Sequence, residues 1–339
     1  MYIFVPMKNI LYLFALILCA CSSSDNRILV KNSGEAQGSY YHIQYLSENG
    51  ENYKSQIDSI LLEVDSSLSI YKDYSLISKL NKRENIKTDT LFNAVFLGAQ
   101  KVFVESEGNF DCSVSPLVNA WGFYKDKFGD SIVVDSAKFR KILPYVGFDK
   151  ISLIADTLVM PKGMSLDFNS IAQGFTVDVI ARFFENKNIK NYLIEVGGEL
   201  LAKGKNADGN IWRVGVDKPS DDIDVKERFQ FILDLENKAL ATSGNYRKFY
   251  ELDGIKYAHT INPFTGFPSQ NRLLSVTVIS NNAASADAFA TAFMVMGVDQ
   301  SLAFISNHPE LKLVAYFVYD ENGKNLSVQS KGMSDFILN

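Results

Sequence analysis

The sequence predicts an α+β fold. Segments with a helical repeat and segments typical of strands are mixed along the chain, without the regular strand–helix alternation of a doubly wound parallel sheet. The composition, with 47% hydrophobic and 22% charged residues over 339 positions, is that of a globular protein able to bury a full core. The net charge of −5 comes without a block of like charges, which argues against nucleic acid as a partner.

Helices are predicted where apolar residues recur with the helical period. Residues 53–71 carry this repeat, and a second amphipathic helix over residues 91–107 stops at Gly108. A third helix runs from Ile171 to Glu185. Strands are predicted from alternating or fully apolar runs that are closed by Gly, Asn or Asp. These runs are residues 131–135, 150–161, 191–204, 211–219, 229–244 and 273–280.

The N-terminal segment is predicted to be an export signal rather than part of the fold. Lys8 precedes an apolar run that is short for a membrane span and ends in small residues before Cys21. The stretch ILCAC followed by SSSDN resembles a bacterial lipobox, in which Cys21 becomes the lipidated first residue. We therefore expect a signal peptide over 1–20, a lipid-anchored tether over 21–27, and an exported lipoprotein that faces the periplasm, with the inner membrane favoured. The alternative, an uncleaved anchor helix, leaves the protein on the same side.

Asp287 lies within ASADAFATAF (284–293), a run of small apolar residues that predicts a buried helix. A carboxylate there needs a partner, because burying it alone costs several kcal/mol or more. Asp287 could cap the helix or join a buried salt bridge. It could instead be a metal ligand, with the Thr291 hydroxyl one turn further along the same face. This residue pattern alone leaves these alternatives open.

The stretch LDFNSIAQGFTVD (166–178) predicts a strand end, a tight turn and a helix that starts near Ser170 or Ile171. A helix N-terminus presents free backbone N–H groups and a partial positive charge, which suits a phosphate. Gln173 and the glycine after it leave room for a ligand to approach. The alternative is that the Asn or Ser of the turn caps the helix and does nothing more.

Several short motifs are weak singly but specific in their order. They are QGSYYHI, SLSIYKDYSLISKLN, GNFDCSVSPL with WGF, LDFNSIAQG, EVGGEL, ATSGNY, HTINPFTGFP and ADAFATAFMVMG. Together they resemble the ApbE family, flavin transferases that take FMN from FAD and attach it to a protein Ser or Thr. The resemblance runs from about Gln37 to beyond Gly297 and so covers nearly all of the expected mature chain.

The resemblance implies a two-lobed fold with mixed or antiparallel sheets, flanking helices and FAD in the central cleft, all formed by residues 28–339. Two departures from the family pattern are Gln173, where Lys is frequent, and Gln37, where Met is usual. Because Gln173 still donates hydrogen bonds, we expect altered affinity rather than lost function. The stretch Gln37–Gly38–Ser39 in place of Met-Gly-Thr is the milder departure, since Ser39 keeps the hydroxyl. The implied FAD contacts are Gln37, Tyr71, Asn109, Phe110, Asp111, Asp167, Gln173 and, through its backbone, Ile261.

The resemblance also implies one or two Mg²⁺ ions on the FAD diphosphate, held by the carbonyl of Ser170 and the side chains of Asp287 and Thr291. Oxygen ligands of these kinds suit a hard cation, which neutralises charge on the diphosphate. His259 is the candidate base for the acceptor hydroxyl, because the unperturbed pKa of histidine is about 6.5.

We therefore expect Mg²⁺-dependent transfer of the FMN moiety of FAD to a Ser or Thr hydroxyl of an acceptor flavoprotein, with release of AMP. The expected acceptors are extracytoplasmic flavoproteins, such as subunits of a redox-driven sodium pump. One alternative is a Mg²⁺-dependent FAD pyrophosphatase, in which water replaces the protein hydroxyl. Another is a lipoprotein that binds and delivers FAD without chemistry.

Overall fold

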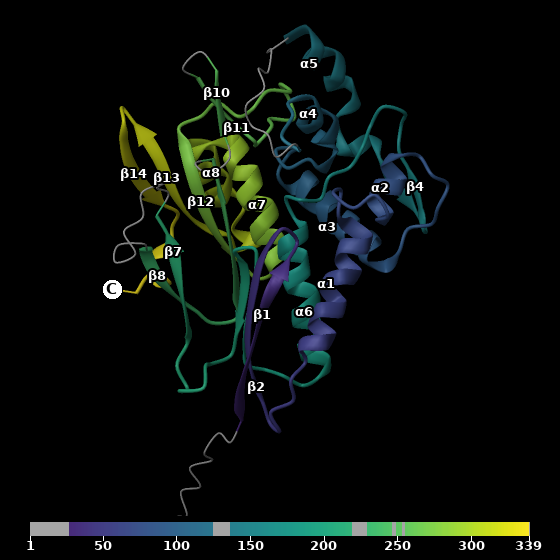
Figure 1. Ribbon diagram of the computed structural model, residues 1–339. Helices are drawn as coiled ribbons and strands as arrows, with labels where there is room; N and C mark the ends of the chain where they lie inside the picture. The colour runs from purple at the N-terminus through teal and green to yellow at the C-terminus, as the bar shows by residue number, and fades with distance from the viewer. Residues whose placement is uncertain (1–26, 125–135, 219–228, 246–248, 253–254, 339) are drawn as a thin grey trace, which may run out of the picture.

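An antiparallel sheet of eight strands forms the centre of the molecule in this computed structural model (Figure 1). The structure describes residues 27–124, 136–218, 229–245, 249–252 and 255–338. The strand order is β1-β2-β5-β6-β9-β12-β13-β14, and each neighbouring pair is antiparallel. The strands are β1 (Ile28–Ala36), β2 (Ser39–Ser47), β5 (Tyr192–Val196), β6 (Glu199–Lys203), β9 (Lys238–Gly244), β12 (Leu273–Ser280), β13 (Val314–Glu321) and β14 (Lys324–Gln329).

Three two-stranded ribbons accompany the large sheet. They are β3–β4 (Ser152–Ile154 and Thr157–Val159), β7–β8 (Trp212–Asp217 and Phe229–Leu235) and β10–β11 (Phe249–Leu252 and Ile255–Ala258). The β7–β8 ribbon packs on one face of the sheet, because Trp212 and Leu233 share a buried cluster with Leu200 and Ala202 of β6. That face of β6 is therefore separate from the face that meets the helices.

Helices cover the opposite face of the sheet in two layers (Figure 1). α6 contacts β5 and β6, α7 contacts β9 and β12, and α1 and α3 lie outside α6 and α7 respectively. The remaining helices α2, α4 and α5 belong to the helical lobe, whereas α8 follows α7 directly. The helices are α1 (Lys54–Leu68), α2 (Leu76–Asn81), α3 (Thr90–Glu105), α4 (Ser115–Ala120), α5 (Ser136–Ile142), α6 (Ala172–Asn186), α7 (Ala283–Met296) and α8 (Val298–Asn307).

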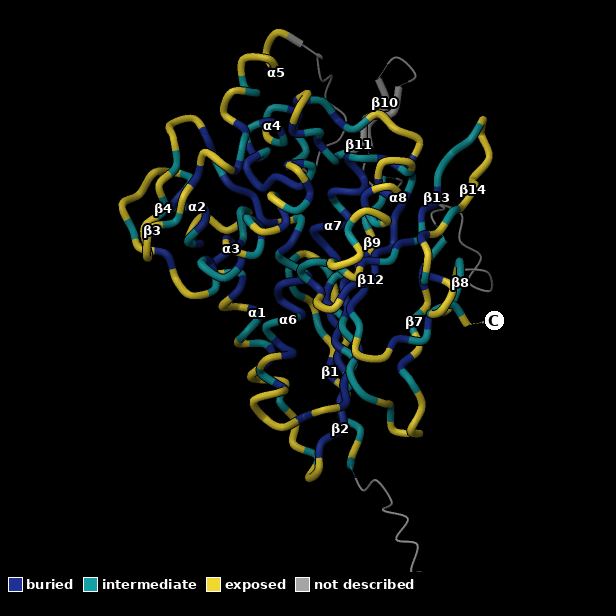
Figure 2. The backbone as a smooth tube through the Cα atoms, turned by 180° about the vertical axis from the view of Figure 1, so that it is seen from behind, coloured by how far each residue is buried: buried dark blue, intermediate teal, exposed yellow. Residues whose placement is uncertain are grey.

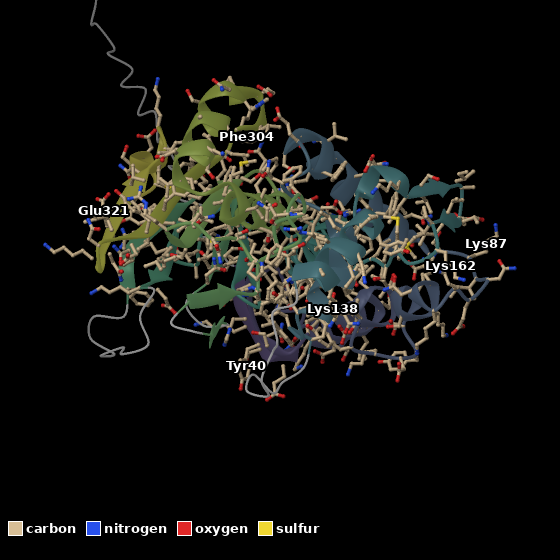
Figure 3. All side chains as sticks on the ribbon, turned by 90° about the horizontal axis from the view of Figure 1, so that it is seen from above. Tyr40, Lys87, Lys138, Lys162, Phe304 and Glu321 are labelled. Atoms are coloured by element: carbon tan, nitrogen blue, oxygen red, sulfur yellow. The ribbon has the colours of Figure 1, made fainter. Side chains whose placement is uncertain are left out.

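The largest buried cluster crosses from the helical lobe into the sheet. It joins Phe92 and Phe96 of α3 to Phe289 and Phe293 of α7 and to Phe317 of β13. Figure 2 shows the buried residues concentrated along the sheet strands and α7, with exposed residues toward the outer helices and loop tips. Seen from above, Glu321 marks the sheet end of the molecule, and Lys87 and Lys162 mark the far end of the helical lobe (Figure 3). The two lobes therefore share one core and are held together by apolar packing.

Most elements lie where the sequence predicts them. The three predicted helices correspond to α1, α3 and α6, and the helix around ASADAFATAF is α7. The predicted strand runs contain β3 to β9 and β12, several of them folded back as hairpins, and the run 131–135 lies outside the described residues. Outside the predicted runs lie β1, β2, β10, β11, β13 and β14. Every helix in the described ranges is too short or too polar to cross a membrane.

Candidate functional site

Buried carboxylates gather around the starts of α6 and α7. The exposed fractions of Asp111, Asp167, Glu199 and Asp287 are 7%, 8%, 7% and 6%. Burial raises the pKa of each of these acids, because a low-dielectric interior disfavours the ionised form. The thiol of Cys112 lies among them, since its pKa is raised first by burial and then by the carboxylates of Asp111, Asp167 and Asp287.

Asp287 neither caps its helix nor joins an ion pair in the part of the chain that the structure describes. The N-cap of α7 is Asn282, whose Oδ1 accepts a hydrogen bond of 2.8 Å from the N–H of Ser285. Oδ2 of Asp287 accepts one hydrogen bond of 3.1 Å, from the backbone N–H of Gly174. Burial raises the pKa of Asp287 to about 7, an effect that the Gly174 N–H opposes and the Asp178 carboxylate increases. The structure therefore excludes Asp287 as the cap of its own helix and, among the described residues, as a partner in a salt bridge, but it does give one N–H of the first turn of α6 an acceptor. The metal interpretation stays a prediction.

A side chain of α6, that of Asp178, holds the start of α7 in place by binding the backbone of α7. The two oxygens of Asp178 accept hydrogen bonds of 2.9 Å each from the N–H groups of Ala283 and Ala284. Burial raises the pKa of Asp178 to about 6. At Gly174 a side chain would collide with the carbonyl oxygen of Ala283, so only glycine permits this close approach of the helices. These contacts set Asp287 beside the first turn of α6.

The start of α6 has no side-chain cap. Its N-cap residue is Ile171, and neither the Asn169 nor the Ser170 side chain accepts a hydrogen bond from an N–H group of the first turn. The interpretation as a simple Asn or Ser cap is therefore wrong. Ser170 is half-buried, and its hydroxyl is hydrogen-bonded to the Cys112 thiol. In the described part of the chain the N–H of Ala172 donates to the carbonyl of Phe168 (2.8 Å) and the N–H of Gly174 to Oδ2 of Asp287 (3.1 Å), which leaves the N–H of Gln173 for an anion. The partial positive charge of the helix start also favours an anion such as phosphate.

The side chain of Gln37 contacts the N-terminal end of α6, the end at which Gln173 lies. Nε2 of Gln37, in the turn between β1 and β2, donates a hydrogen bond of 2.8 Å to the Thr176 hydroxyl, and Oε1 is buried without a partner among the described atoms. The side-chain amide of Gln173 lies against Gly197 in the turn between β5 and β6, where a Cβ atom would overlap it. The structure thus brings these two predicted FAD residues to one end of the sheet.

Tyr71 and Asp167 are linked through Asn169. Nδ2 of Asn169 donates to the Tyr71 hydroxyl (3.2 Å) and to Oδ2 of Asp167 (3.4 Å). The Tyr124 hydroxyl also donates to Oδ2 of Asp167, at 2.7 Å, and its ring stands edge-on to Tyr71 with the centroids 6.4 Å apart. Tyr71 is 63% exposed, so its ring can stack against a flat ligand such as flavin.

The side chains of Asn109, Phe110 and Asp111 point into the protein. Phe110 is fully buried, and Nδ2 of Asn109 donates to the carbonyl of Ser106. Asp111 accepts hydrogen bonds from the N–H groups of Ser113 (2.6 Å) and Phe148 (3.2 Å). Any contact between a ligand and Asn109 or Phe110 would therefore be made chiefly by backbone atoms. The N–H of Asp167 donates to the carbonyl of Cys112, 2.8 Å away, which ties this segment to the Tyr71–Asp167 group.

His259 and Ile261 lie on the loop between β11 and β12. Ile261 is 5% exposed and packs in a cluster with Trp121, whose Nε1 donates to the carbonyl of Gly266 (2.9 Å). His259 is half-buried, and the hydroxyl of the next residue, Thr260, donates to Asn245 at the end of β9. Because the side chain of Ile261 is held in the core, a contact with FAD would have to be made by its backbone, and that contact stays a prediction.

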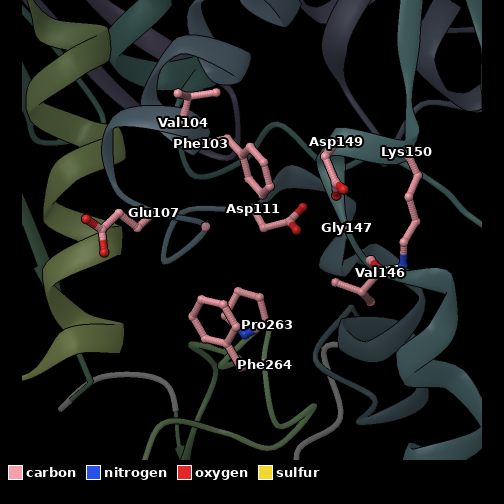
Figure 4. A pocket seen from close by; sticks show the side chains of 11 residues that line it. Phe103, Val104, Glu107, Asp111, Val146, Gly147, Asp149, Lys150, Pro263 and Phe264 are labelled. Atoms are coloured by element: carbon pink, nitrogen blue, oxygen red, sulfur yellow. Dashed lines mark hydrogen bonds between the residues drawn. The ribbon is translucent and has the colours of Figure 1, made fainter.

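A cavity of about 440 Å³ lies next to this loop, between the end of α3 and residues 146–150. Figure 4 shows Asp111 and Asp149 on one side of it and Pro263 and Phe264 on the other. Asp111 is the one predicted FAD residue in its lining, and Tyr71, Gln173 and Asp287 are not part of it. The cavity therefore borders the group of buried carboxylates at Asp111 and does not include Asp287.

The donor set fits a hard cation that also uses ligand oxygens. The described residues hold no group of three His, Cys, Asp or Glu side chains arranged as a complete metal site. Mg²⁺ characteristically binds through one or two carboxylates together with substrate phosphates and waters. A buried Asp287 without a cationic partner, the half-buried Thr291 one turn on, and Ser170 at the uncapped start of α6 match that requirement.

Three residues of this region were not predicted. Asp178 and Tyr124 position other groups, and no local pattern distinguishes them from ordinary surface polar residues. Glu199 is not among the predicted residues, although its sequence context resembles that of Asp287. It is a lone acid in an apolar run, VGGELL, directly after two glycines.

Comparison with known proteins shows the family and the fold of this chain. The model of the ApbE family matches residues 37–315. The chain belongs to the ApbE family. It is 34% identical over 310 residues to the FAD:protein FMN transferase of Vibrio cholerae, covering 88% of this chain and 90% of that protein. The FAD:protein FMN transferase of Haemophilus influenzae is 33% identical over 305 residues, covering 85% and 86% of the two chains.

Solved ApbE structures share the fold. The flavin transferase ApbE from Vibrio cholerae superposes with a TM-score of 0.80 at 31% identity, covering 91% of this chain and 99% of that one. The apo form of the Pseudomonas stutzeri flavinyl transferase ApbE gives a TM-score of 0.81 at 28% identity, covering 91% and 96%. The predicted α+β architecture of the ApbE type is therefore confirmed.

Proposed function

We propose that this chain transfers the FMN moiety of FAD to a Ser or Thr hydroxyl of an acceptor protein and releases AMP. Its membership of the ApbE family and its relatives named FAD:protein FMN transferase support this activity. The observation that carries the proposal is the buried Asp287 carboxylate, which faces the uncapped start of α6 and has no cationic partner among the described residues.

The side chains of this chain would bind and orient the two halves of FAD. Tyr71 offers an exposed ring for the flavin, and Asn169 fixes the position of its hydroxyl. Gln173 at the first turn of α6 can donate hydrogen bonds to the phosphates, and the partial positive charge of the helix start adds to the favourable field. This arrangement holds the diphosphate close to Asp287.

We propose that the site takes Mg²⁺ through Asp287, Thr291 and the carbonyl of Ser170. The ion would supply neutralisation of the charge that develops on the diphosphate. In the transfer the acceptor oxygen forms a bond to the FMN-side phosphorus while the bond from that phosphorus to the bridging oxygen breaks. AMP leaves with the bridging oxygen, and the hydroxyl proton passes to His259 as general base.

The export signal and anchor complete the proposal. Acylation of Cys21 would hold the protein at the membrane facing the periplasm, where extracytoplasmic flavoproteins such as sodium-pump subunits are the proposed acceptors. The lipobox-like run before Cys21 supports this placement. Residues 1–26 lie outside the described part of the chain.

The fate of FAD separates this proposal from its alternatives. The purified full-length protein is incubated with FAD and Mg²⁺, with and without a purified flavoprotein subunit of a sodium pump, and the soluble nucleotides are separated by chromatography. Transfer predicts AMP that appears with the acceptor present and no equivalent free FMN. Equal amounts of free FMN and AMP without acceptor would identify a pyrophosphatase, and unchanged FAD would identify a binding protein.

A further inference from the structure

Glu199 is a buried carboxylate that the mechanism above does not use. It is the first residue of β6, directly after the Gly197–Gly198 turn, and is 7% exposed. Its Oε2 atom is buried and has no hydrogen-bond partner among the described atoms. An orphan carboxylate oxygen in a protein interior is costly, so it calls for a ligand that is absent from the protein itself.

The alternation of β6 directs Glu199 toward the helices. Leu200 and Ala202 pack with the β7–β8 ribbon on one face, whereas Leu201 packs against the cluster that contains Val177 and Ala283 of α6 and α7. Successive side chains of a strand point to opposite faces, so Glu199 shares the face of Leu201. β6 and α7 are in contact, and Glu199 therefore lies in the layer that holds Asp287.

Glu199 and Asp287 act on each other electrostatically. Burial raises the pKa of Glu199 well above its ordinary range, and the nearby Asp287 carboxylate raises it further. Neither acid forms an ion pair with a Lys, Arg or His side chain in the described ranges. A cation between β6 and α7 would give the unpartnered Oε2 atom of Glu199 and the open acceptor sites of Asp287 a common partner.

We propose that Glu199 is a second protein carboxylate of the divalent cation site, opposite Asp287 across the interface between β6 and α7. This inference rests on the cation site of the proposed function and extends its ligand set. One or two carboxylates with substrate phosphates and waters is the arrangement that Mg²⁺ favours, and Mn²⁺ accepts the same oxygen donors. Glu199 would also raise the affinity of the site before FAD arrives, because it adds a second negative charge.

The chain provides a matched control for Glu199. Glu195 lies on the preceding strand β5, and its neighbours Ile194 and Val196 face the helices, so Glu195 points to the opposite face. Its side chain is 40% exposed and lies 3.7 Å from Nδ1 of His42. Glu195→Gln therefore removes a carboxylate from the same hairpin without touching the interface between β6 and α7.

The test is a titration of the full-length protein with Mn²⁺, followed by electron paramagnetic resonance, in the absence of FAD. Glu199→Gln should weaken Mn²⁺ binding by at least roughly tenfold, the lower end of the loss seen when groups around a bound metal are removed. Glu195→Gln should bind Mn²⁺ like the parent protein. Without metal, Glu199→Gln should have a thermal midpoint close to that of the parent, because Gln has the shape of the neutral, protonated carboxyl that burial favours.

The outcomes separate this inference from the proposed cation site. If Glu199→Gln binds Mn²⁺ with unchanged affinity while Asp287→Asn does not bind, Glu199 is not a ligand and the site at Asp287 stands. If the parent protein binds no Mn²⁺ either alone or with FAD, both proposals fail. Should Glu199→Gln not fold, Glu199→Asp keeps the charge but withdraws it by one methylene, and an unchanged Mn²⁺ affinity in that variant would equally contradict the assignment.

Discussion

The backbone N–H of Gly174 donates a hydrogen bond of 3.1 Å to Oδ2 of Asp287 and so joins the first turn of α6 to the second turn of α7. This contact gives a buried carboxylate one partner and leaves its remaining acceptor sites open. It also places Asp287 at the first turn of α6, where the partial positive charge of the helix start favours a phosphate. The proposed reaction depends on this alignment of a carboxylate with an anion site.

Removing the Asp287 carboxylate should abolish transfer without unfolding the protein. Asp287→Ala leaves the Gly174 N–H unpaired, but it also relieves a buried charge and introduces the best helix former. We therefore expect an unchanged or slightly raised thermal midpoint and loss of Mg²⁺-dependent transfer. Asn282→Ala, which removes the N-cap of α7, should instead cost about 1 kcal/mol of stability and retain transfer. A large fall in the midpoint of Asp287→Ala with activity preserved would contradict the metal assignment.

The raised pKa of Asp287 predicts a pH-dependent stability in the absence of metal. The pKa is raised from 3.8 to about 7 on folding, so between these values the folded protein holds a proton that the unfolded chain has released. The free energy of unfolding should therefore fall as the pH rises from about 4 to 7. Urea unfolding at several pH values would measure this slope, and Asp287→Asn should flatten it. An equal slope in both proteins would show that Asp287 is not buried as described.

Loss of the candidate base should slow the chemical step while FAD still binds. His259→Ala is expected to lower turnover by roughly 10²- to 10⁴-fold, the usual contribution of a positioned general base. His42→Ala provides the control, since that ring is 61% exposed on β2. Single-turnover transfer and FAD affinity are measured for both variants. Parent-like turnover in His259→Ala would mean that the base lies elsewhere or is not needed.

A cation at position 173 should strengthen the contact with the phosphates. Gln173 lies in the first turn of α6 against Gly197, and a lysine there would replace a neutral donor with a charged one. Gln173→Lys is therefore expected to keep transfer and to bind FAD more tightly through charge-assisted hydrogen bonds. Asn186→Lys adds the same charge at the other end of α6 and should not change FAD affinity. Loss of FAD binding in a folded Gln173→Lys protein would refute the placement of the phosphates.

The membrane anchor is tested at its acylated residue. Because Cys21 ends a lipobox-like run, Cys21→Ser should either release the protein from the membrane fraction or leave an uncleaved precursor. Fractionation and mass spectrometry of the mature N-terminus distinguish these products. An acylated, membrane-bound Cys21→Ser protein would disprove this site of lipidation.

Local patterns predict the four longest helices, α1, α3, α6 and α7, and most of the inner strands, but not the shorter helices α2, α4, α5 and α8. α7 and Asp287 could be predicted because a lone acid in an apolar helical run is conspicuous. The edge strands β1 and β14 carry many exposed residues and lack a clear apolar alternation, so the sequence does not predict them. The Gly174–Asp287 and Gln37–Thr176 contacts join residues far apart in the chain, and they depend on helix and strand packing that no local pattern encodes.

The intact mass of an acceptor protein tests the central claim most directly. A purified sodium-pump flavoprotein subunit is incubated with FAD, Mg²⁺ and the full-length protein, and its mass is compared with that of the same subunit incubated with Asp287→Ala. Our account predicts a mass gain of one FMN moiety on a Ser or Thr with the parent protein and none with the variant. An acceptor of unchanged mass, together with free FMN and AMP in solution, would contradict transfer and identify hydrolysis of FAD instead.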